Sequence, residues 1–123
     1  MDNFNSSIEE KRRYPRVESN LPLQYKNIKK LSGVSMGSLA SNISAGGIRF
    51  KTNEFISLAC RLVVEINLPT IPKPIKAISK VAWIRKLPVG EQYELGNQFL
   101  EIAKEDKDHI TNFTNKLSTP NLQ

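Results

Sequence analysis

Cysteine and histidine are almost absent from this chain of 123 residues, which contains only Cys60 and His109. A single cysteine cannot form an intramolecular disulfide, and one thiol with one imidazole cannot supply the ligands of a structural zinc site. No apolar run approaches the roughly 18 residues that a transmembrane helix needs, and the N-terminus lacks the apolar centre of a signal peptide. We therefore expect a cytoplasmic protein with no bound metal and no membrane insertion.

Signatures of catalysis are also missing from the sequence. There is no phosphate-binding loop, no HExxH pair and no nucleophile elbow. His109 falls in a predicted helix with no nucleophile nearby in the sequence, and we interpret it as solvent-facing. Cys60 precedes an alternating strand, where a small core or edge residue is expected. The sequence therefore predicts a protein that is not an enzyme, with no catalytic residues and no cofactor.

The composition and length of the chain are typical of one globular domain. Hydrophobic residues make up 39% of the chain and charged residues 24%, as in ordinary soluble domains. A chain of this length buries enough surface for one hydrophobic core. The net charge of +6 favours anionic partners, but charge alone does not choose among nucleotides, nucleic acids and acidic surfaces.

Strand-length runs separated by glycine and proline dominate the sequence. The clearest is Arg61–Leu68, in which apolar and polar residues alternate. In chain order, we predict strands over Leu21–Ile28, Val34–Ile43, Gly47–Thr52, Arg61–Leu68, Ile75–Arg85 and Gln92–Ile102. Within the fifth run, the apolar residues Val81 to Ile84 predict a segment that is covered on both faces.

Only the C-terminal part of the chain, about residues 104–117, has helical spacing. Ile110, Phe113 and Leu117 fall on one helical face, which predicts a single amphipathic helix. The predicted fold is therefore all-β with one C-terminal helix, an antiparallel barrel or tight sandwich. Residues 118–123 form a predicted flexible tail.

The N-terminal segment divides into two parts of different charge. Residues 1–10 are polar, and we expect a flexible arm there. Residues 11–16 hold four cations, namely Lys11, Arg12, Arg13 and Arg16. Arginine is notable because its planar fork can hydrogen-bond a phosphate or a guanine edge and can stack on a base. Taken alone, such a run is more often a solvated surface or a nonspecific polyanion contact.

A second candidate site is the strand end and turn Ser41–Gly47. Asn42 and Ser44 carry hydrogen-bonding side chains, and the adjacent Gly46 and Gly47 permit positive φ and leave backbone N–H groups accessible. The same residue types also build ordinary β-turns for purely local reasons.

Together, and in this order, the two segments resemble the PilZ domain family of cyclic di-GMP receptors. The RxxxR pattern at Arg12 and Arg16 is followed by [D/N]xSxxG at Asn42, Ser44 and Gly47. Further similarities are Gly47–Phe50, Val81–Trp83 and Leu95–Phe99, so that the resemblance extends from about Glu10 to Leu117. It implies a six-stranded antiparallel β-barrel with a C-terminal helix over residues 11–117, preceded by a flexible basic arm.

The resemblance also implies roles for individual residues. Arg12 and Arg16 would clamp the guanine edges and phosphates of cyclic di-GMP, Asn42 and Ser44 would hydrogen-bond a guanine, and Gly47 would close the motif. Asn42 stands where aspartate is more frequent, so a charged contact is replaced by a weaker neutral one. Secondary candidates for ligand contact are Lys11, Arg13, Gly46 and Trp83, although a tryptophan in a doubly apolar strand is more often part of the core.

The implied function is that of a cyclic di-GMP receptor and adaptor, whose arm folds over the barrel and alters contacts with a protein effector. Outputs of such a receptor include motility, biofilm and exopolysaccharide production. Two alternatives are a PilZ module that works by protein contact without nucleotide, and a small basic barrel that binds single-stranded nucleic acid. The low aromatic content, 7%, makes a nucleic-acid partner the less favoured of these.

Overall fold

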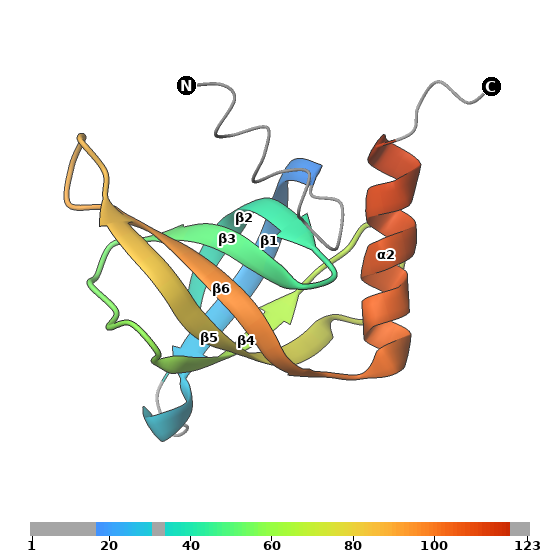
Figure 1. The fold of residues 1–123 in the computed structure, drawn as a ribbon, viewed down its shortest axis with the longest axis horizontal. Coiled ribbons are helices and arrows are strands. Elements are labelled where there is room, and N and C mark those ends of the chain that lie inside the picture. Colours follow the sequence, from blue (N-terminus) through green and yellow to red (C-terminus); the bar gives the residue numbers. More distant parts are fainter. Residues whose placement is uncertain (1–16, 31–33, 119–123) are drawn as a thin grey trace.

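The structure is a computed structural model that describes residues 17–30 and 34–118. Six strands, one short 3₁₀ helix and one α-helix follow each other along the chain (Figure 1). Their bounds are β1 Val17–Asn27, η1 Ile28–Lys30, β2 Met36–Ser44, β3 Gly47–Thr52, β4 Arg61–Ile66, β5 Ile75–Lys86, β6 Tyr93–Ile102 and α2 Lys104–Ser118. None of the helices in this described part of the chain is long and apolar enough to cross a membrane.

The six strands form a closed barrel in the order β1-β2-β3-β6-β5-β4, and every neighbouring pair is antiparallel. Pairing of β1 with β4 closes the ring, so that no sheet edge is left open. The predicted all-β barrel with one C-terminal helix is confirmed. Strand β1 starts at Val17 rather than at the predicted Leu21. Val17 and Glu18 pair with Ile43 and Asn42 of β2 and so extend β1 toward the N-terminus.

Alternate residues of each strand point into the barrel and form its core. In β4 the predicted inward residues Leu62, Val64 and Ile66 are all buried. Phe50 of β3 is fully buried and its ring lies 5.1 Å from that of Tyr25, centroid to centroid. Burial of each large apolar side chain stabilises the fold by roughly 1.5–3 kcal/mol, so these interior rows hold the barrel together.

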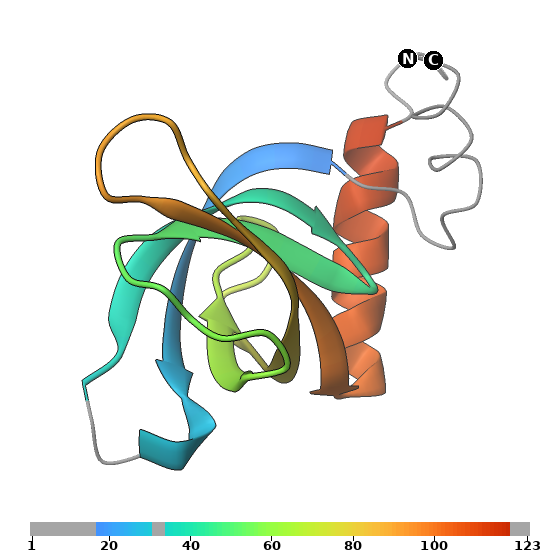
Figure 2. The ribbon, with the colours of Figure 1, turned by 60° about the vertical axis from the view of Figure 1, so that its left-hand side comes forward.

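Helix α2 packs beside the barrel against β2 and β1 (Figure 2). Ile110 and Phe113 are buried as predicted, whereas Leu117 is 49% exposed. Thr114 is buried instead, because a residue at i+4 shares the face of Ile110. Its hydroxyl donates to the carbonyl oxygen of Thr111 at 3.1 Å, so the buried oxygen is satisfied.

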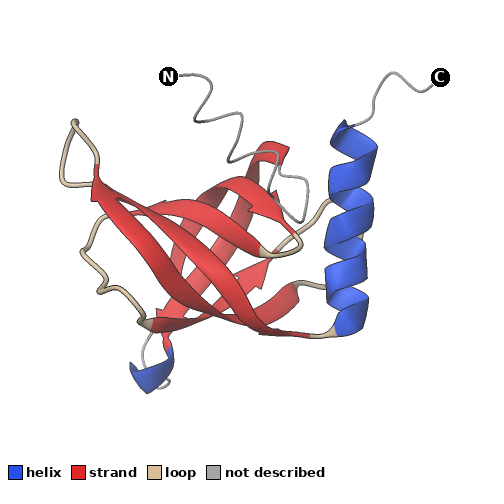
Figure 3. Ribbon diagram, in the orientation of Figure 1, coloured by secondary structure: helices blue, strands red, loops and turns tan. Residues whose placement is uncertain are grey.

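The short helix η1 lies far from α2, and it is seen at the lower left when the ribbon is coloured by secondary structure (Figure 3). Both ribbon views place the β2–β3 turn on the α2 side of the barrel and η1 on the other. The barrel therefore has two distinct ends, and the Ser41–Gly47 segment belongs to the end that faces α2.

Two β-bulges change which residues face outward. In β2 the register with β3 shifts between Ala40 and Asn42, so Ser41 is the extra residue. Ala40 is fully buried in the core, whereas Asn42, two residues later, pairs with Arg49 on the outer side of the wall and is 7% exposed there. In β5 the register with β6 shifts between Val81 and Trp83, with Ala82 as the extra residue. Val81 is therefore buried in the core, whereas Trp83, two residues later, faces outward.

Buried Tyr25 makes the stability of the barrel sensitive to alkaline pH. Burial, followed by the charge of Glu54 and a hydrogen bond to it, raises the pKa of Tyr25 from 10.0 to about 12. The neutral phenol is thus favoured in the folded state, and its contribution is fully present below pH 10 and lost as the pH rises toward 12. Between these values the unfolding free energy of the wild type should fall relative to that of Tyr25→Phe, by at most about 1.4 kcal/mol per pH unit. Urea unfolding at stepped pH measures this difference, and parallel curves for the two proteins would contradict it.

Candidate functional site

Asn42 and Ser44 lie at the end of β2, next to the turn into β3. Both residues are buried, at 7% and 4% exposure. The Ser44 hydroxyl oxygen accepts a hydrogen bond from the backbone N–H of Gly46 at 3.1 Å. Ser44 therefore stabilises the turn itself, which is the local role that the sequence already allowed.

Gly47 is required for close packing of two strands. A Cβ atom on Gly47 would overlap with the backbone carbonyl oxygen of Asn97 in β6. Its φ is not positive; among the described residues, Gly90 in the β5–β6 hairpin is the only glycine with positive φ, at 70°. The expected reason for glycine at this position was thus wrong, because the constraint is the approach of β6 rather than a left-handed backbone.

Four strands bring Asn42, Arg49, Gly96 and Trp83 into one row on the outer face of the barrel. Asn42 pairs with Arg49, Arg49 with Gly96, and Gly96 with Trp83. Residues directly opposite each other in paired strands project to the same side, so the row is continuous from β2 to β5. This outer row links the motif residue Asn42 to the tryptophan that the sequence singled out.

Trp83 is not part of the core, contrary to the prediction of a doubly covered segment. The bulge at Ala82 turns its indole outward, where it is 36% exposed. The ring lies over Gly96, because a Cβ atom at that position would overlap with the indole Nε1 and Cε2 atoms. Trp83 therefore presents a partly accessible aromatic surface three strands away from Asn42, across β3 and β6.

Gly96→Ala should displace the Trp83 indole from the barrel wall. The added methyl group meets a side chain that is already part-exposed and can rotate, so we expect a stability loss on the order of 1 kcal/mol. Trp83 is the only tryptophan in the chain, so its fluorescence emission should shift to longer wavelength. Gly37→Ala, which adds a methyl group with no atom within 4 Å, is the control. An unchanged emission spectrum in Gly96→Ala would show that the ring does not rest on Gly96.

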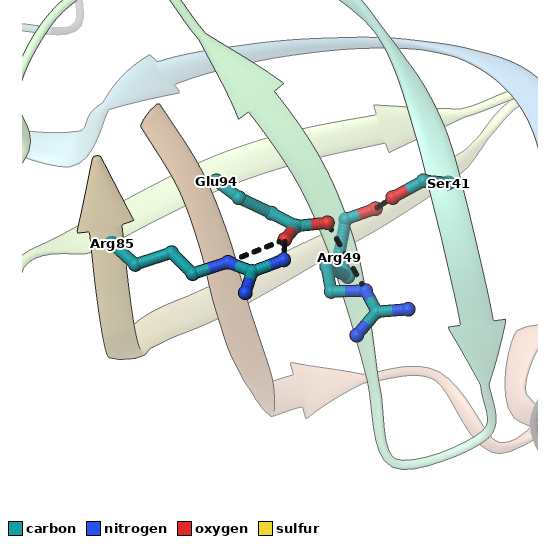
Figure 4. A network of polar contacts seen from close by, with 4 residues as sticks. All are labelled: Ser41, Arg49, Arg85 and Glu94. Carbon is teal, nitrogen blue, oxygen red and sulfur yellow. Dashed lines mark hydrogen bonds and ion pairs between the residues drawn. The ribbon is translucent and has the colours of Figure 1, made fainter. Parts of the chain in front are cut away.

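A buried carboxylate lies beside this row, between two arginines (Figure 4). The side chain of Glu94 in β6 is 6% exposed. Arg85 of β5 donates to its Oε1 from Nε at 3.1 Å and from Nη2 at 2.7 Å. On the other side, Arg49 Nε lies 3.3 Å from Glu94 Oε2, but it is not oriented to donate a hydrogen bond.

The sequence motifs did not single out Arg49, Arg85 or Glu94. Strand alternation indicates that Arg49 faces outward, but only the register of β3 with β6 places it near Glu94. The sequence analysis also missed a buried hydrogen bond, which the Ser79 hydroxyl donates to Asn97 Oδ1 at 3.1 Å. Asn97 is the residue whose backbone approaches Gly47. These contacts join strands that are distant in sequence, so no local pattern could reveal them.

The arginine motif lies outside the described residues. Nothing in the structure places Lys11, Arg12, Arg13 or Arg16. The residues that follow the motif are placed, however, because Val17 pairs with Ile43 and Glu18 with Asn42. The backbone of β1 therefore runs beside the second motif from Val17 onward.

The sequence profile of the PilZ domain matches residues 10–116, nearly the whole chain. The chain belongs to the PilZ domain family. PilZ domains are a family of cyclic di-GMP receptors that are typically non-catalytic. Among curated protein sequences, no significant match to this PilZ protein is found.

Solved structures with the same fold include several PilZ proteins. The Bacillus subtilis inhibitor of motility (MotI/DgrA) matches with a TM-score of 0.78 and 22% identity, over 92% of this chain and 54% of that one. The PilZ domain of Escherichia coli YcgR, solved with c-di-GMP, matches with a TM-score of 0.64 and 15% identity, over 91% and 99% of the two chains. The K. pneumonia MrkH–c-di-GMP complex matches with a TM-score of 0.66 and 18% identity, over 89% and 53%.

At these identities the likeness shows the fold alone. The present chain spans about half the length of MotI and of MrkH, and nearly all of the YcgR PilZ domain. The similarity therefore covers the barrel and its helix, and the activities of the longer proteins do not follow from it.

Proposed function

We propose that this PilZ protein is a cyclic di-GMP receptor and adaptor. The observation that carries the proposal is the presence of both family motifs, with Asn42 on the outer face of the barrel and β1 running beside it directly after Arg16. In this proposal Arg12 and Arg16 grip the phosphates and guanine edges, Asn42 and Ser44 bind a guanine, and Gly47 keeps the turn close to β6.

Charge and hydrogen bonding support a small anionic ligand. Guanidinium groups form bidentate, charge-assisted hydrogen bonds with phosphate, which offset the entropy of ordering the arm. The weaker candidates for contact are Lys11 and Arg13, beside the arginine motif, Gly46 in the turn, and Trp83, whose exposed ring can lie against a base or ribose. Ordering of the arm against the barrel would then change the surface offered to a protein effector that controls motility, biofilm or exopolysaccharide output.

Calorimetric titration of the full chain with cyclic di-GMP tests the proposal. We expect saturable binding, and much weaker binding of cyclic di-AMP, because adenine lacks the O6 acceptor and the N1–H and N2–H donors of guanine. No heat with cyclic di-GMP at tens of micromolar would overturn the proposal and favour a PilZ module that works without nucleotide. Equal binding of both dinucleotides, falling steeply with salt, would instead indicate a nonspecific polyanion site.

A further inference from the structure

We infer that Arg49 is a further ligand-contacting residue of this site, which donates hydrogen bonds from its Nη atoms to a phosphate of the cyclic dinucleotide. The inference rests on the proposed function. It adds to the two sequence motifs a cation that β3 of the barrel holds in place. Glu94 acts as its positioning residue.

The position of Arg49 is the first argument. It lies in the centre of the outer row, between Asn42 on β2 and Gly96 on β6, with the Trp83 indole over Gly96. A ligand that reaches both Asn42 and Trp83 must pass over Arg49. The Arg49 backbone is held in place as well, because its carbonyl oxygen accepts a hydrogen bond from Ser41, the bulge residue, at 3.2 Å.

The unequal sharing of Glu94 is the second argument. Arg85 makes two hydrogen bonds to one carboxylate oxygen and is enough to pair the buried charge. Arg49 approaches the other oxygen only through Nε. Figure 4 shows its two Nη atoms directed away from Glu94, and neither has a hydrogen bond or ion pair to a residue in the described ranges.

The chemistry of the two Nη atoms of Arg49 indicates an anion with paired oxygens. Two guanidiniums around one carboxylate leave one positive charge in excess, and that charge lies on the part-exposed Arg49, whose side chain is 29% accessible. The two Nη atoms form a planar fork that matches two phosphate oxygens, and Glu94 restricts its rotation before any ligand arrives. A phosphate bound there loses less ordering entropy than one bound by a free side chain.

Arg49→Met and Arg85→Met form a matched pair for the test. Each removes one positive charge and one partner of Glu94, but only Arg49 lies in the outer row. In calorimetric titrations with cyclic di-GMP we expect the Kd of Arg49→Met to rise at least about tenfold, as for loss of a charge-assisted hydrogen bond. The Kd of Arg85→Met should rise less than about threefold, because its charge is mostly screened by solvent. Equal losses in the two variants, or an unchanged Kd in Arg49→Met, would overturn the inference.

Arg49→Lys separates ligand contact from folding. Lysine keeps the charge beside Glu94 but lacks the planar fork, so thermal melting should match the wild type while the Kd still rises severalfold. Wild-type affinity in Arg49→Lys would show that only charge matters and would contradict the bidentate contact. If the wild type itself does not bind cyclic di-GMP, the proposed function fails and this inference fails with it; binding by the wild type with intact binding in Arg49→Met removes the inference alone.

Discussion

Gly47→Ala is expected to lower the free energy of unfolding by roughly 2–3 kcal/mol, and the melting temperature by roughly 10 °C. The added methyl group meets the backbone carbonyl of Asn97, which cannot move aside as a flexible side chain could. Either β3 and β6 separate locally or the clash is spread over both strands. Thermal melting followed by circular dichroism measures the loss.

Gly37→Ala is the matched control for this substitution. It lies in the same sheet, has open space around it and does not have a positive φ, so alanine should leave stability unchanged or slightly increased. A Gly47→Ala protein that melts with the wild type would show that the two strands do not approach so closely. Loss of ligand binding in Gly47→Ala alone would therefore not establish ligand contact, since the turn itself is disturbed.

The double substitution Arg12→Ala/Arg16→Ala is expected to weaken cyclic di-GMP binding by more than about a hundredfold. Under the proposed function, both guanidiniums contact the ligand with charge-assisted hydrogen bonds that no other group replaces. The melting temperature of the ligand-free protein is the control, because a loss of binding without a change in melting assigns the effect to ligand contact rather than to folding. Calorimetric titration and thermal melting on the same sample provide the two measurements.

Lys29→Ala/Lys30→Ala removes the same charge from the opposite end of the barrel. Both lysines are exposed on η1, away from the β2–β3 turn. If binding depends on the motif rather than on total charge, this variant should bind with a Kd within about twofold of the wild type. Equal weakening in the two double variants would favour general electrostatic attraction over a defined site.

The strand pattern could be predicted because burial in a barrel wall imposes a period of two. Leu62, Val64 and Ile66 point inward as their alternation indicates, and all six strands overlap with their predicted ranges. The helix was predicted from the helical spacing of Ile110, Phe113 and Leu117, of which the first two are buried and Leu117 is exposed. Prediction failed at Trp83, because a single extra residue in β5 reverses the face of everything after it.

The candidate site shows the same division between local and long-range information. Asn42, Ser44 and Gly47 could be selected from the sequence because their residue types and spacing are characteristic. Arg49 could not be selected, since its relation to Glu94 and Trp83 exists only across β6 and β5. The reason for glycine at position 47 was likewise inaccessible, because the atom that excludes a side chain belongs to Asn97.

Alternation of apolar residues and one segment of helical spacing were by themselves sufficient to predict an all-β barrel or sandwich with one helix, whereas the cyclic di-GMP site is what the resemblance of two spaced motifs to the PilZ family implies. These are properties of residue type and local spacing. Strand register, the bulges at Ser41 and Ala82, and the arrangement of Arg49, Glu94 and Trp83 were decided only in the tertiary structure. They depend on which backbone atoms meet when the barrel closes, and that closure joins β1 to β4, which are separated in the sequence by β2 and β3.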